Sequence, residues 1–412
     1  MIGSELPKGW DIQPLKEVVT STKGKKPKQL SELPFDNSIP YIDIKALEKD
    51  LIEQYADVES SKSFSPNDIA VVWDGARCGW VSKSKEGAIG STICALTPKN
   101  NIESNYLYYF LLEKYPIVNS KGRGVGIPHV DPTFFWDMEV PIPSPKEQKQ
   151  IAEKLDKLFD QIETIKEASN KIPELLKNFR QQVLTYAVTG KLTERWRIEN
   201  EIENEFVSIE TDKHRDYNYN IPDTWKLLSF SNVVSIESNL VNPNDYKDYP
   251  LIAPDNIESM TGRILSKPTV AEIAPKSSKH YFTKDSLVYS KIRPYLSKIA
   301  YVDFDGLCSA DMYPLKTKLN IFYLYYYMLS SEFLSFATTA GERIVLPKIN
   351  QKSLNIIPVP VPSLKEQEEI VKRVQILFDI LDDVERRYNT LCEKLDKLPQ
   401  ALLCKAFKGE LL

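Results

Sequence analysis

Cationic side chains that could contact phosphate groups gather in glycine-containing stretches of the chain. Residues 21–28 (STKGKKPK) place four lysines within six positions, and residues 121–129 (KGRGVGIPH) combine glycines with lysine, arginine and histidine. Glycine permits close approach of a backbone, lysine and arginine bind phosphate oxygens, and arginine can also read the edge of guanine. Both stretches therefore suit contact with a nucleic acid. A solvated surface loop remains the alternative for residues 21–28.

The second half of the chain repeats this arrangement. Residues 341–350 (GERIVLPKIN) carry arginine, lysine and an asparagine that could read adenine. Arg77 and Arg293 each follow an apolar run, at residues 68–73 and 285–290, that we predict to be a strand. The same placement in both halves predicts a shared surface role. The candidate DNA-contacting residues are Lys23, Lys25, Lys26, Lys28, Arg77, Lys121, Arg123, His129, Arg293, Arg343, Lys348 and Asn350.

No arrangement of residues for catalysis is evident. Residues 241–246 (VNPNDY) only superficially resemble a motif for methylation of a base amine, because Asn244 replaces its second proline. The sequence has no Walker motif, and its glycine-rich run does not follow a strand in a clear strand–helix–strand unit. The three histidines form no evident catalytic pair or triad. We therefore predict a protein without catalytic activity and without a metal site.

Composition limits the class of protein. The chain has 412 residues, which favours two or three domains, and its 42% hydrophobic and 27% charged residues are typical of a soluble globular protein. No apolar run is long enough to span a bilayer, and the start of the sequence lacks the pattern of a signal peptide. The five cysteines form no C-x-x-C pair. These features predict a cytoplasmic protein without a membrane partner.

The net charge of −4 is unusual for a protein that binds nucleic acid. The distribution of charge matters more than its sum. If the chain grips DNA, either its lysines and arginines are segregated to one face or a partner supplies much of the phosphate binding.

An internal repeat organises the chain. Residues 140–163 (VPIPSPKEQKQIAEKLDKLFDQIE) return as residues 359–382 (VPVPSLKEQEEIVKRVQILFDILD), 219 positions later. The same offset relates residues 185–192 to residues 404–411. A repeat of this length is a whole module, so we predict two copies of a domain followed by a long helix, related by a pseudo-two-fold axis.

The better-matched segments show the spacing of long amphipathic helices. Apolar residues follow a 4-3 pattern that is typical of a coiled-coil seam. The seam positions are Ile151, Leu155, Leu158, Ile162, Ile165, Ser169, Ile172, Leu176, Phe179 and Val183, and their counterparts from Ile370 to Leu402. We predict that the two helices pair antiparallel as a rod of about 65 Å, although packing into two separate cores is an alternative. Pro173 and Pro399 predict a kink or a break in each helix.

Local signals define where these helices begin and end. Ser144 and Ser363 each precede a glutamate three positions later, which is the pattern of a capping box. Gly190 and Gly409 stand where a C-terminal cap belongs. The resulting organisation is a first variable domain at 1–143, a long helix at 144–192, a connector at 193–220, a second variable domain at 221–362 and a long helix at 363–412. Both variable domains are expected to be mixed α/β, so the fold class is α+β.

The helix starts carry a resemblance to a known family. Two variable domains, each followed by a V-P-[IV]-P-S-x-K-E-Q helix that ends in A-[VF]-x-G-[KE]-L, resemble the specificity subunit of a Type I restriction-modification system. The resemblance covers essentially the whole chain. It implies that each variable domain is a target recognition domain for one half of an interrupted double-stranded DNA sequence.

The resemblance also implies partners. The long helices would separate the target recognition domains and dock two methyltransferase subunits, and restriction subunits would complete an ATP-dependent nuclease. S-adenosylmethionine, ATP and magnesium would then belong to those partners, with no cofactor in this chain. Two alternatives stay open: a specificity subunit whose partner fuses methylase and nuclease, and a coiled-coil scaffold that binds no DNA.

Overall fold

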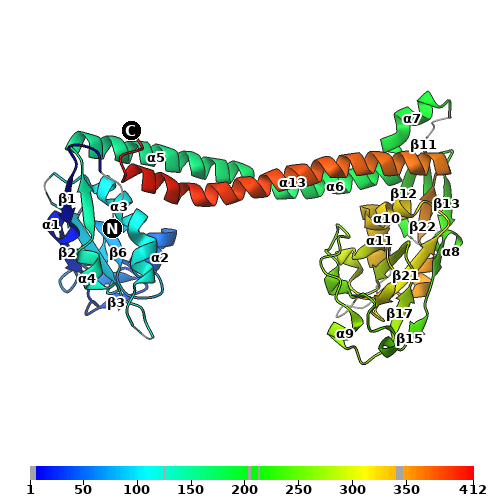
Figure 1. Ribbon diagram of the computed structural model, residues 1–412, viewed down its shortest axis with the longest axis horizontal. Helices are drawn as coiled ribbons and strands as arrows, with labels where there is room; N and C mark the ends of the chain where they lie inside the picture. The colour runs from blue at the N-terminus through cyan, green and yellow to red at the C-terminus, as the bar shows by residue number, and fades with distance from the viewer. Residues whose placement is uncertain (1–5, 100, 125, 203–205, 212–213, 340–346) are drawn as a thin grey trace. The chain divides into compact units, whose positions relative to one another are not determined.

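The computed structural model describes residues 6–99, 101–124, 126–202, 206–211, 214–339 and 347–412. The chain forms two compact units, unit 1 (Met1–Asn170 with Asn389–Leu412) and unit 2 (Lys171–Tyr388). Each unit holds one mixed domain and one pair of helical segments (Figure 1). The units therefore cut across the order of the chain, because the last long helix contributes residues to both of them.

The first variable domain, in unit 1, contains two four-stranded sheets and a two-stranded ladder. One sheet is antiparallel in the order β2 (Val19–Lys23), β9 (Ile93–Pro98), β6 (Ile69–Val72) and β7 (Val81–Lys83). The other has the order β3 (Leu30–Ser31), β5 (Tyr55–Asp57), β4 (Ser38–Ile42) and β8 (Ala88–Ile89), with β4 and β8 parallel. The ladder pairs β1 (Asp11–Pro14) with β10 (Glu139–Ile142). Its helices are α1 (Leu15–Val18), α2 (Ile44–Lys49), α3 (Ser104–Ser120) and α4 (Pro132–Trp136).

The second variable domain repeats the first of these sheets and varies the other. The repeated sheet has the order β14 (Val234–Ile236), β21 (Met312–Thr317), β18 (Ser286–Ser290) and β19 (Ile299–Val302). The varied sheet has the order β15 (Leu240–Val241), β17 (Lys279–Phe282), β20 (Gly306–Cys308) and β16 (Leu251–Ile252). The ladder pairs β13 (Lys226–Ser229) with β22 (Pro358–Val361).

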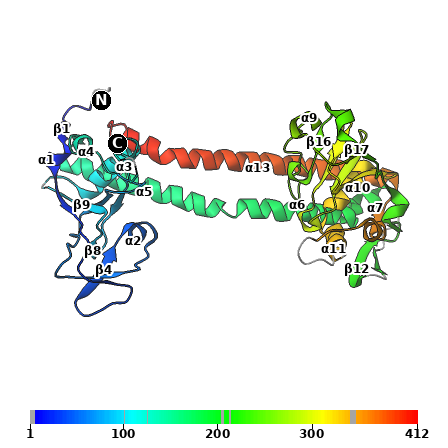
Figure 2. The same cartoon turned by 90° about the horizontal axis from the view of Figure 1, so that it is seen from below.

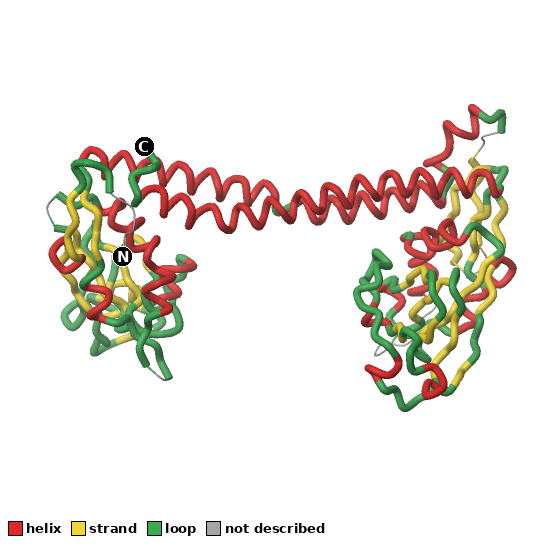
Figure 3. The backbone as a smooth tube through the Cα atoms, in the orientation of Figure 1, coloured by secondary structure: helices red, strands yellow, loops and turns green. Residues whose placement is uncertain are grey.

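The helices of the second variable domain are short. They are α8 (Phe230–Val233), α9 (Val270–Ile273), α10 (Ile321–Leu329), α11 (Ser331–Thr339) and α12 (Gln351–Asn355), with 3-10 turns η2 (Pro243–Tyr246), η3 (Pro254–Asn256) and η4 (Pro294–Leu296). The connector forms η1 (Lys191–Thr193), α7 (Glu194–Glu199) and a hairpin of β11 (Phe206–Thr211) and β12 (His214–Pro222). In each unit the strands, yellow in Figure 3, lie to one side of the paired helices.

Apolar burial explains why the predicted strands form. β6 and β18 occupy the runs predicted at 68–73 and 285–290, and every residue of both strands is buried. A continuous apolar run suits a strand that is covered on both faces. The helical stretch between Ile321 and Thr339 divides at Ser330, which is extended between α10 and α11.

The long helices are α5 (Pro145–Ser169), α6 (Ile172–Val188) and α13 (Leu364–Ala406). The break predicted near Pro173 is confirmed, because α5 ends at Ser169 and Pro173 lies in the first turn of α6, where no hydrogen bond is lost. The break predicted at Pro399 is wrong: α13 continues through it as one helix of 43 residues (Figure 2). Leu395 and Leu403 are buried on either side of this proline, so packing outweighs its cost.

The helical segments pair antiparallel within unit 2. Arg180 of α6 forms an ion pair with Asp382 of α13 at 2.6 Å. Twelve positions later, the carbonyl of Leu192 accepts a hydrogen bond at 3.0 Å from Arg373, which lies earlier in α13. Residue numbers thus rise along the first helical segment while they fall along α13, which confirms the predicted antiparallel pairing.

Unit 1 shows the same direction of pairing. The Lys154 ammonium donates to the carbonyl of Leu411 at 2.6 Å, and Lys166 forms an ion pair with Asp396 at 2.9 Å. The seam is not buried throughout, because Ile165 and several later seam residues are exposed. A pair of helices covers only one side of each partner, which leaves apolar flanks open.

Most of the predicted caps are confirmed. Ser144 and Glu147 form the full capping box of α5, and Gly190 and Gly409 adopt left-handed conformations just after the helices. The second capping box is only half formed. The Ser363 hydroxyl accepts from the Glu366 amide at 3.3 Å, but the Glu366 carboxylate turns to Thr193, Arg197 and Trp225.

The glutamine of the repeated K-E-Q motif joins each long helix to its variable domain. Gln148 and Gln367 are both fully buried. Each accepts at 2.8 Å from the backbone amide of a residue just before the domain's main helix, Glu103 in unit 1 and Asn320 in unit 2. Each also donates at 3.0 Å to a proline carbonyl ahead of its own helix. The motif is thus a structural junction, which accounts for its return in both copies.

Candidate nucleic-acid interface

The glycine-rich loop of the first variable domain packs against the turn that follows β6. The Trp73 amide donates to the Thr92 carbonyl at 2.8 Å, and the Trp73 carbonyl accepts from Val130 at 3.0 Å. The Gly75 amide then donates to the Pro128 carbonyl at 2.8 Å. These backbone bonds fix the loop on the end of the sheet.

The second variable domain makes the same three bonds with different residues. The Lys291 amide donates to the Asp311 carbonyl at 3.0 Å, and the Lys291 carbonyl accepts from Ile349 at 2.9 Å. The Arg293 amide donates to the Pro347 carbonyl at 2.8 Å. Lys291 therefore takes the place of Trp73, with an offset of 218 residues rather than 219.

This offset corrects the predicted pairing of Arg77 with Arg293. Arg293 occupies the place of Gly75, and both adopt positive φ, +49° for Arg293 and +112° for Gly75. A left-handed arginine is uncommon, and such residues gather at functional sites. Arg77 corresponds instead to Tyr295, and its guanidinium pairs with Glu48.

Three of the predicted residues of the first variable domain meet around two carboxylates. His129 Nδ1 lies 2.7 Å from Asp74 Oδ1, and Lys23 Nζ lies 2.9 Å from Asp74 Oδ2. Arg123 pairs with Asp131 at 2.6 Å, and its backbone exchanges hydrogen bonds with His129. Burial opposes ionisation of Asp74, but the hydrogen bonds from Lys23 and His129 outweigh it and lower the pKa of Asp74.

The remaining predicted lysines of this domain do not join that cluster. Lys121 ends α3, with its Nζ 3.9 Å from the ring centre of Phe134. Lys25, Lys26 and Lys28 are exposed on the loop between β2 and β3. Within the described residues no carboxylate forms an ion pair with these three, so their charges face solvent.

The predicted residues of the second variable domain are more dispersed. Lys348 Nζ pairs with Asp311 Oδ1 at 3.0 Å. The side-chain oxygen of Asn350 accepts from the Ser353 amide and caps α12, so that oxygen is not available to a base. Arg343 lies outside the described residues.

The candidates named from the sequence do not include the carboxylates or Lys291, which directly follows β18. Asp74, Asp131 and Asp311 hold the predicted cations, and Lys291 lies beside Lys348. Asp74 and Lys291 each stand at the end of a predicted strand, so their position carried a signal. Their partners could not be found without the pairing of distant segments.

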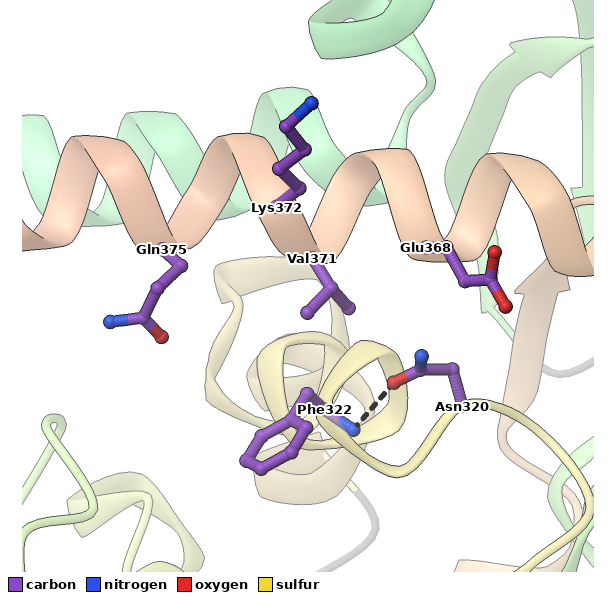
Figure 4. A pocket seen from close by; sticks show the side chains of 6 residues that line it. All are labelled: Asn320, Phe322, Glu368, Val371, Lys372 and Gln375. Atoms are coloured by element: carbon purple, nitrogen blue, oxygen red, sulfur yellow. Dashed lines mark hydrogen bonds between the residues drawn. The ribbon is translucent and has the colours of Figure 1, made fainter.

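A shallow hollow of about 390 Å³ lies in unit 2 beside α13 (Figure 4). Glu368, Val371, Lys372 and Gln375 line it from α13, and Asn320 and Phe322 line it from the start of α10. Its lining is mostly apolar, with charged residues at its edge. No group of metal ligands is found among the described residues, and none of the helices described there could cross a membrane.

Comparison with known proteins identifies the family. A family model described as the Type I restriction modification DNA specificity domain matches residues 7–174 and again residues 222–393. Two matches that together span most of the chain agree with the internal repeat. The chain therefore belongs to the family of Type I restriction-modification specificity subunits, which confirms the resemblance noted in the sequence.

Individual relatives agree with this assignment. The Type I restriction enzyme EcoDI specificity subunit of Escherichia coli is 42% identical over 314 residues, which cover 75% of this chain and 70% of that protein. The EcoKI specificity subunit of Escherichia coli strain K12 is 28% identical over 458 residues, 100% of this chain and 91% of that protein.

Two solved structures share the fold. An HsdS subunit from Thermoanaerobacter tengcongensis gives a TM-score of 0.64 at 18% identity, with 100% of this chain and 99% of that chain covered. A chain from a structure of Type I R-M complex assembly and conformational transition gives 0.66 at 17%, with 99% and 100% covered. This likeness confirms the predicted two-domain α+β architecture.

Proposed function

We propose that this chain is the sequence-reading subunit of a Type I restriction-modification complex, with each variable domain reading one half of an interrupted double-stranded DNA site. The observation that carries the proposal is the repeated loop-on-strand arrangement. In each domain a segment that carries exposed cations, Lys121 and Arg123 in the first and Lys348 in the described part of the second, is fixed by the same three backbone hydrogen bonds to the end of the same sheet. Rigidly held Lys, Arg and His side chains suit both phosphate contact and base reading.

The proposed protein partners are two methyltransferase subunits and the restriction subunits. Exposed apolar residues on the long helices support helix docking. Ile376, Ile380 and Val384 follow one side of α13, and Leu175 and Phe179 follow one side of α6, with Ile380 56% and Leu175 63% exposed. Apolar residues in helical spacing that face solvent are typical of a surface that another helix covers.

In this proposal the chain contributes recognition and assembly, not catalysis. S-adenosylmethionine, ATP and magnesium would act in the partner subunits. The near-neutral charge of the chain fits a complex in which those subunits supply part of the phosphate binding.

The experiment that tests this function is a genome-wide map of N6-methyladenine in cells that co-express the chain with its neighbouring methyltransferase. Cells with the methyltransferase alone are the control. An interrupted two-part motif that depends on the chain is the expected result. If the complex forms but no motif depends on the chain, the proposed reading function is wrong.

A second experiment tests whether the long helices set the gap between the half-sites. One heptad is removed from both helices, so that the antiparallel pairing keeps its register. Because half-site spacing follows from protein geometry, the expected methylated motif keeps both half-sequences and changes its unspecified gap. An unchanged gap in a complex that still assembles would contradict this idea.

A further inference from the structure

The second variable domain carries a different set of charges from the first at equivalent positions. Where the first domain has Trp73, the second has Lys291. An isolated β-bridge pairs Asp74 with His129 in the first domain, and the equivalent bridge pairs Ile292 with Lys348 in the second. Lys348 therefore stands where the first domain has His129. The two domains thus share a scaffold and differ in the chemistry that it presents.

Lysines crowd one carboxylate at this place in the second domain. Lys348 Nζ lies 3.0 Å from Asp311, and Lys291 Nζ lies 5.1 Å from the ring centre of Tyr313. Burial and the nearby charge of Lys348 lower the pKa of Lys291, while Asp311 opposes that shift. Two ammonium groups, those of Lys291 and Lys348, therefore share the field of one carboxylate.

A buried polar atom beside these lysines has no hydrogen-bond partner. His280 Nδ1 is buried and unbonded within the described part of the chain, and the residue is only 4% exposed. Burial and the charge of Lys291 lower the pKa of His280, which keeps its ring neutral at pH 7. Around Lys291 and Lys348 the second domain therefore has more positive than negative charge, and a buried ring nitrogen nearby has no hydrogen bond within the described residues.

In the first domain, carboxylates balance the positive charges at the equivalent position. Lys23 and His129 both bind Asp74, and Arg123 binds Asp131. There each cation of the cluster has a carboxylate partner. A bound anion would therefore gain more at the second domain, because Asp311 pairs with Lys348 there and Lys291 forms no ion pair among the described residues.

We propose that Lys291 and Lys348 form a binding site for a DNA backbone phosphate, so that the second domain supplies a larger share of the salt-dependent affinity than the first. This inference rests on the proposed function and goes beyond it by assigning unequal roles to the two half-sites. The cations of the first domain, already paired, contribute more to discrimination of sequence than to attraction of the backbone.

The test uses the assembled complex of the full chain with its methyltransferase, and a duplex that contains the mapped motif. Binding is measured between low and moderate salt. Each phosphate contact contributes a slope of about 0.9 in log affinity against log salt. The K291Q/K348Q variant removes one phosphate site, so it should lower that slope by about 0.9 and weaken motif and scrambled duplexes by the same factor, because phosphate contacts carry no sequence information.

Matched variants sharpen the test. K23Q/R123Q removes two cations from the first domain and should change the slope less while it lowers the preference for the motif. K291R/K348R retains both charges and should retain the slope. Asp311→Asn removes the carboxylate that pairs with Lys348 and should strengthen binding at low salt, an effect opposite in sign to that of the lysine variants.

Two results separate the possible failures. If the wild-type complex shows no preference for any duplex, the proposed function itself fails. If it prefers its motif but K291Q/K348Q leaves the slope unchanged, or weakens only the motif duplex, the lysines are not a phosphate site and the inference is overturned. Thermal unfolding of each variant checks that the domain remains folded.

Discussion

A buried ion pair between the connector and α13 offers a sharp test of the fold of unit 2. The side chains of Arg197 and Glu366 are 0% and 2% exposed. The Glu366 carboxylate also accepts from the Thr193 hydroxyl at 2.7 Å and from Trp225 Nε1 at 3.0 Å. Arg197 in turn donates to the carbonyl of Gly190 at 2.7 Å, which caps the end of α6. One pair thus joins the end of one long helix to the start of the other.

Arg197→Met leaves the Glu366 carboxylate buried with only the neutral donors Thr193 and Trp225. Removing one partner of a buried ion pair costs about 3–5 kcal/mol. That is a large share of the roughly 5–15 kcal/mol that stabilises a typical domain. Glu366→Gln leaves a buried guanidinium and should cost about as much. The double variant R197M/E366Q removes both charges, so it should be more stable than the sum of the single costs predicts.

Unit 1 contains a natural control. Glu147 occupies the position that corresponds to Glu366, but it is only half-buried and its carboxylate accepts from the amide and hydroxyl of Ser144. Those hydrogen bonds lower the pKa of Glu147. Glu147→Gln removes part of a helix cap and should cost much less stability than Glu366→Gln.

The assay is hydrogen exchange across a urea series. Peptides from α6 and from residues 364–388 of α13 report the stability of unit 2, and peptides from α5 report that of unit 1, where E147Q acts. The expected order of stability is wild type and E147Q, then the double variant, then the two single variants. The reasoning is refuted if E366Q costs no more than E147Q, or if the double variant loses the full sum of the single losses.

Other predictions follow from burial. Gln148→Leu and Gln367→Leu each leave backbone groups unsatisfied and should each cost about 1–3 kcal/mol in urea unfolding of the corresponding unit; full stability would contradict the junction role. Burial, with the charge of Lys291, lowers the pKa of His280 in the folded protein. Unit 2 should therefore keep its stability above pH 6.5, the pKa of histidine in the unfolded chain, and lose stability as the pH falls below it. The dependence of stability on pH should be weaker in H280F. Burial raises the pKa of Cys94 to about 11, so a thiol reagent should modify the half-exposed Cys392 in the native protein and Cys94 only on unfolding.

Sequence reasoning located the long helices because their signals are local. Ser144 with Glu147 marks the start of α5, and the repeated apolar spacing marks its buried side. Pro173 and Pro399 show the limit of such signals. Both prolines disfavour a helix interior equally, but only the second lies between buried residues that packing holds in helical register. The sequence shows the cost of each proline and not the packing that offsets it.

The candidate interface was less predictable because it depends on which strands and loops pair. A constant offset of 219 residues would align Arg293 with Asp74, yet the backbone hydrogen bonds place Arg293 where Gly75 lies. The repeats differ by one residue at this turn, so Arg293 takes the left-handed position that Gly75 has in the first domain, and Arg77 lies two residues beyond that position. The conserved scaffold can therefore present new side chains by small changes in loop length as well as by substitution. This explains how two domains with the same sheet order can carry a compensated cluster around Asp74 in one copy and an excess of lysine around Asp311 in the other.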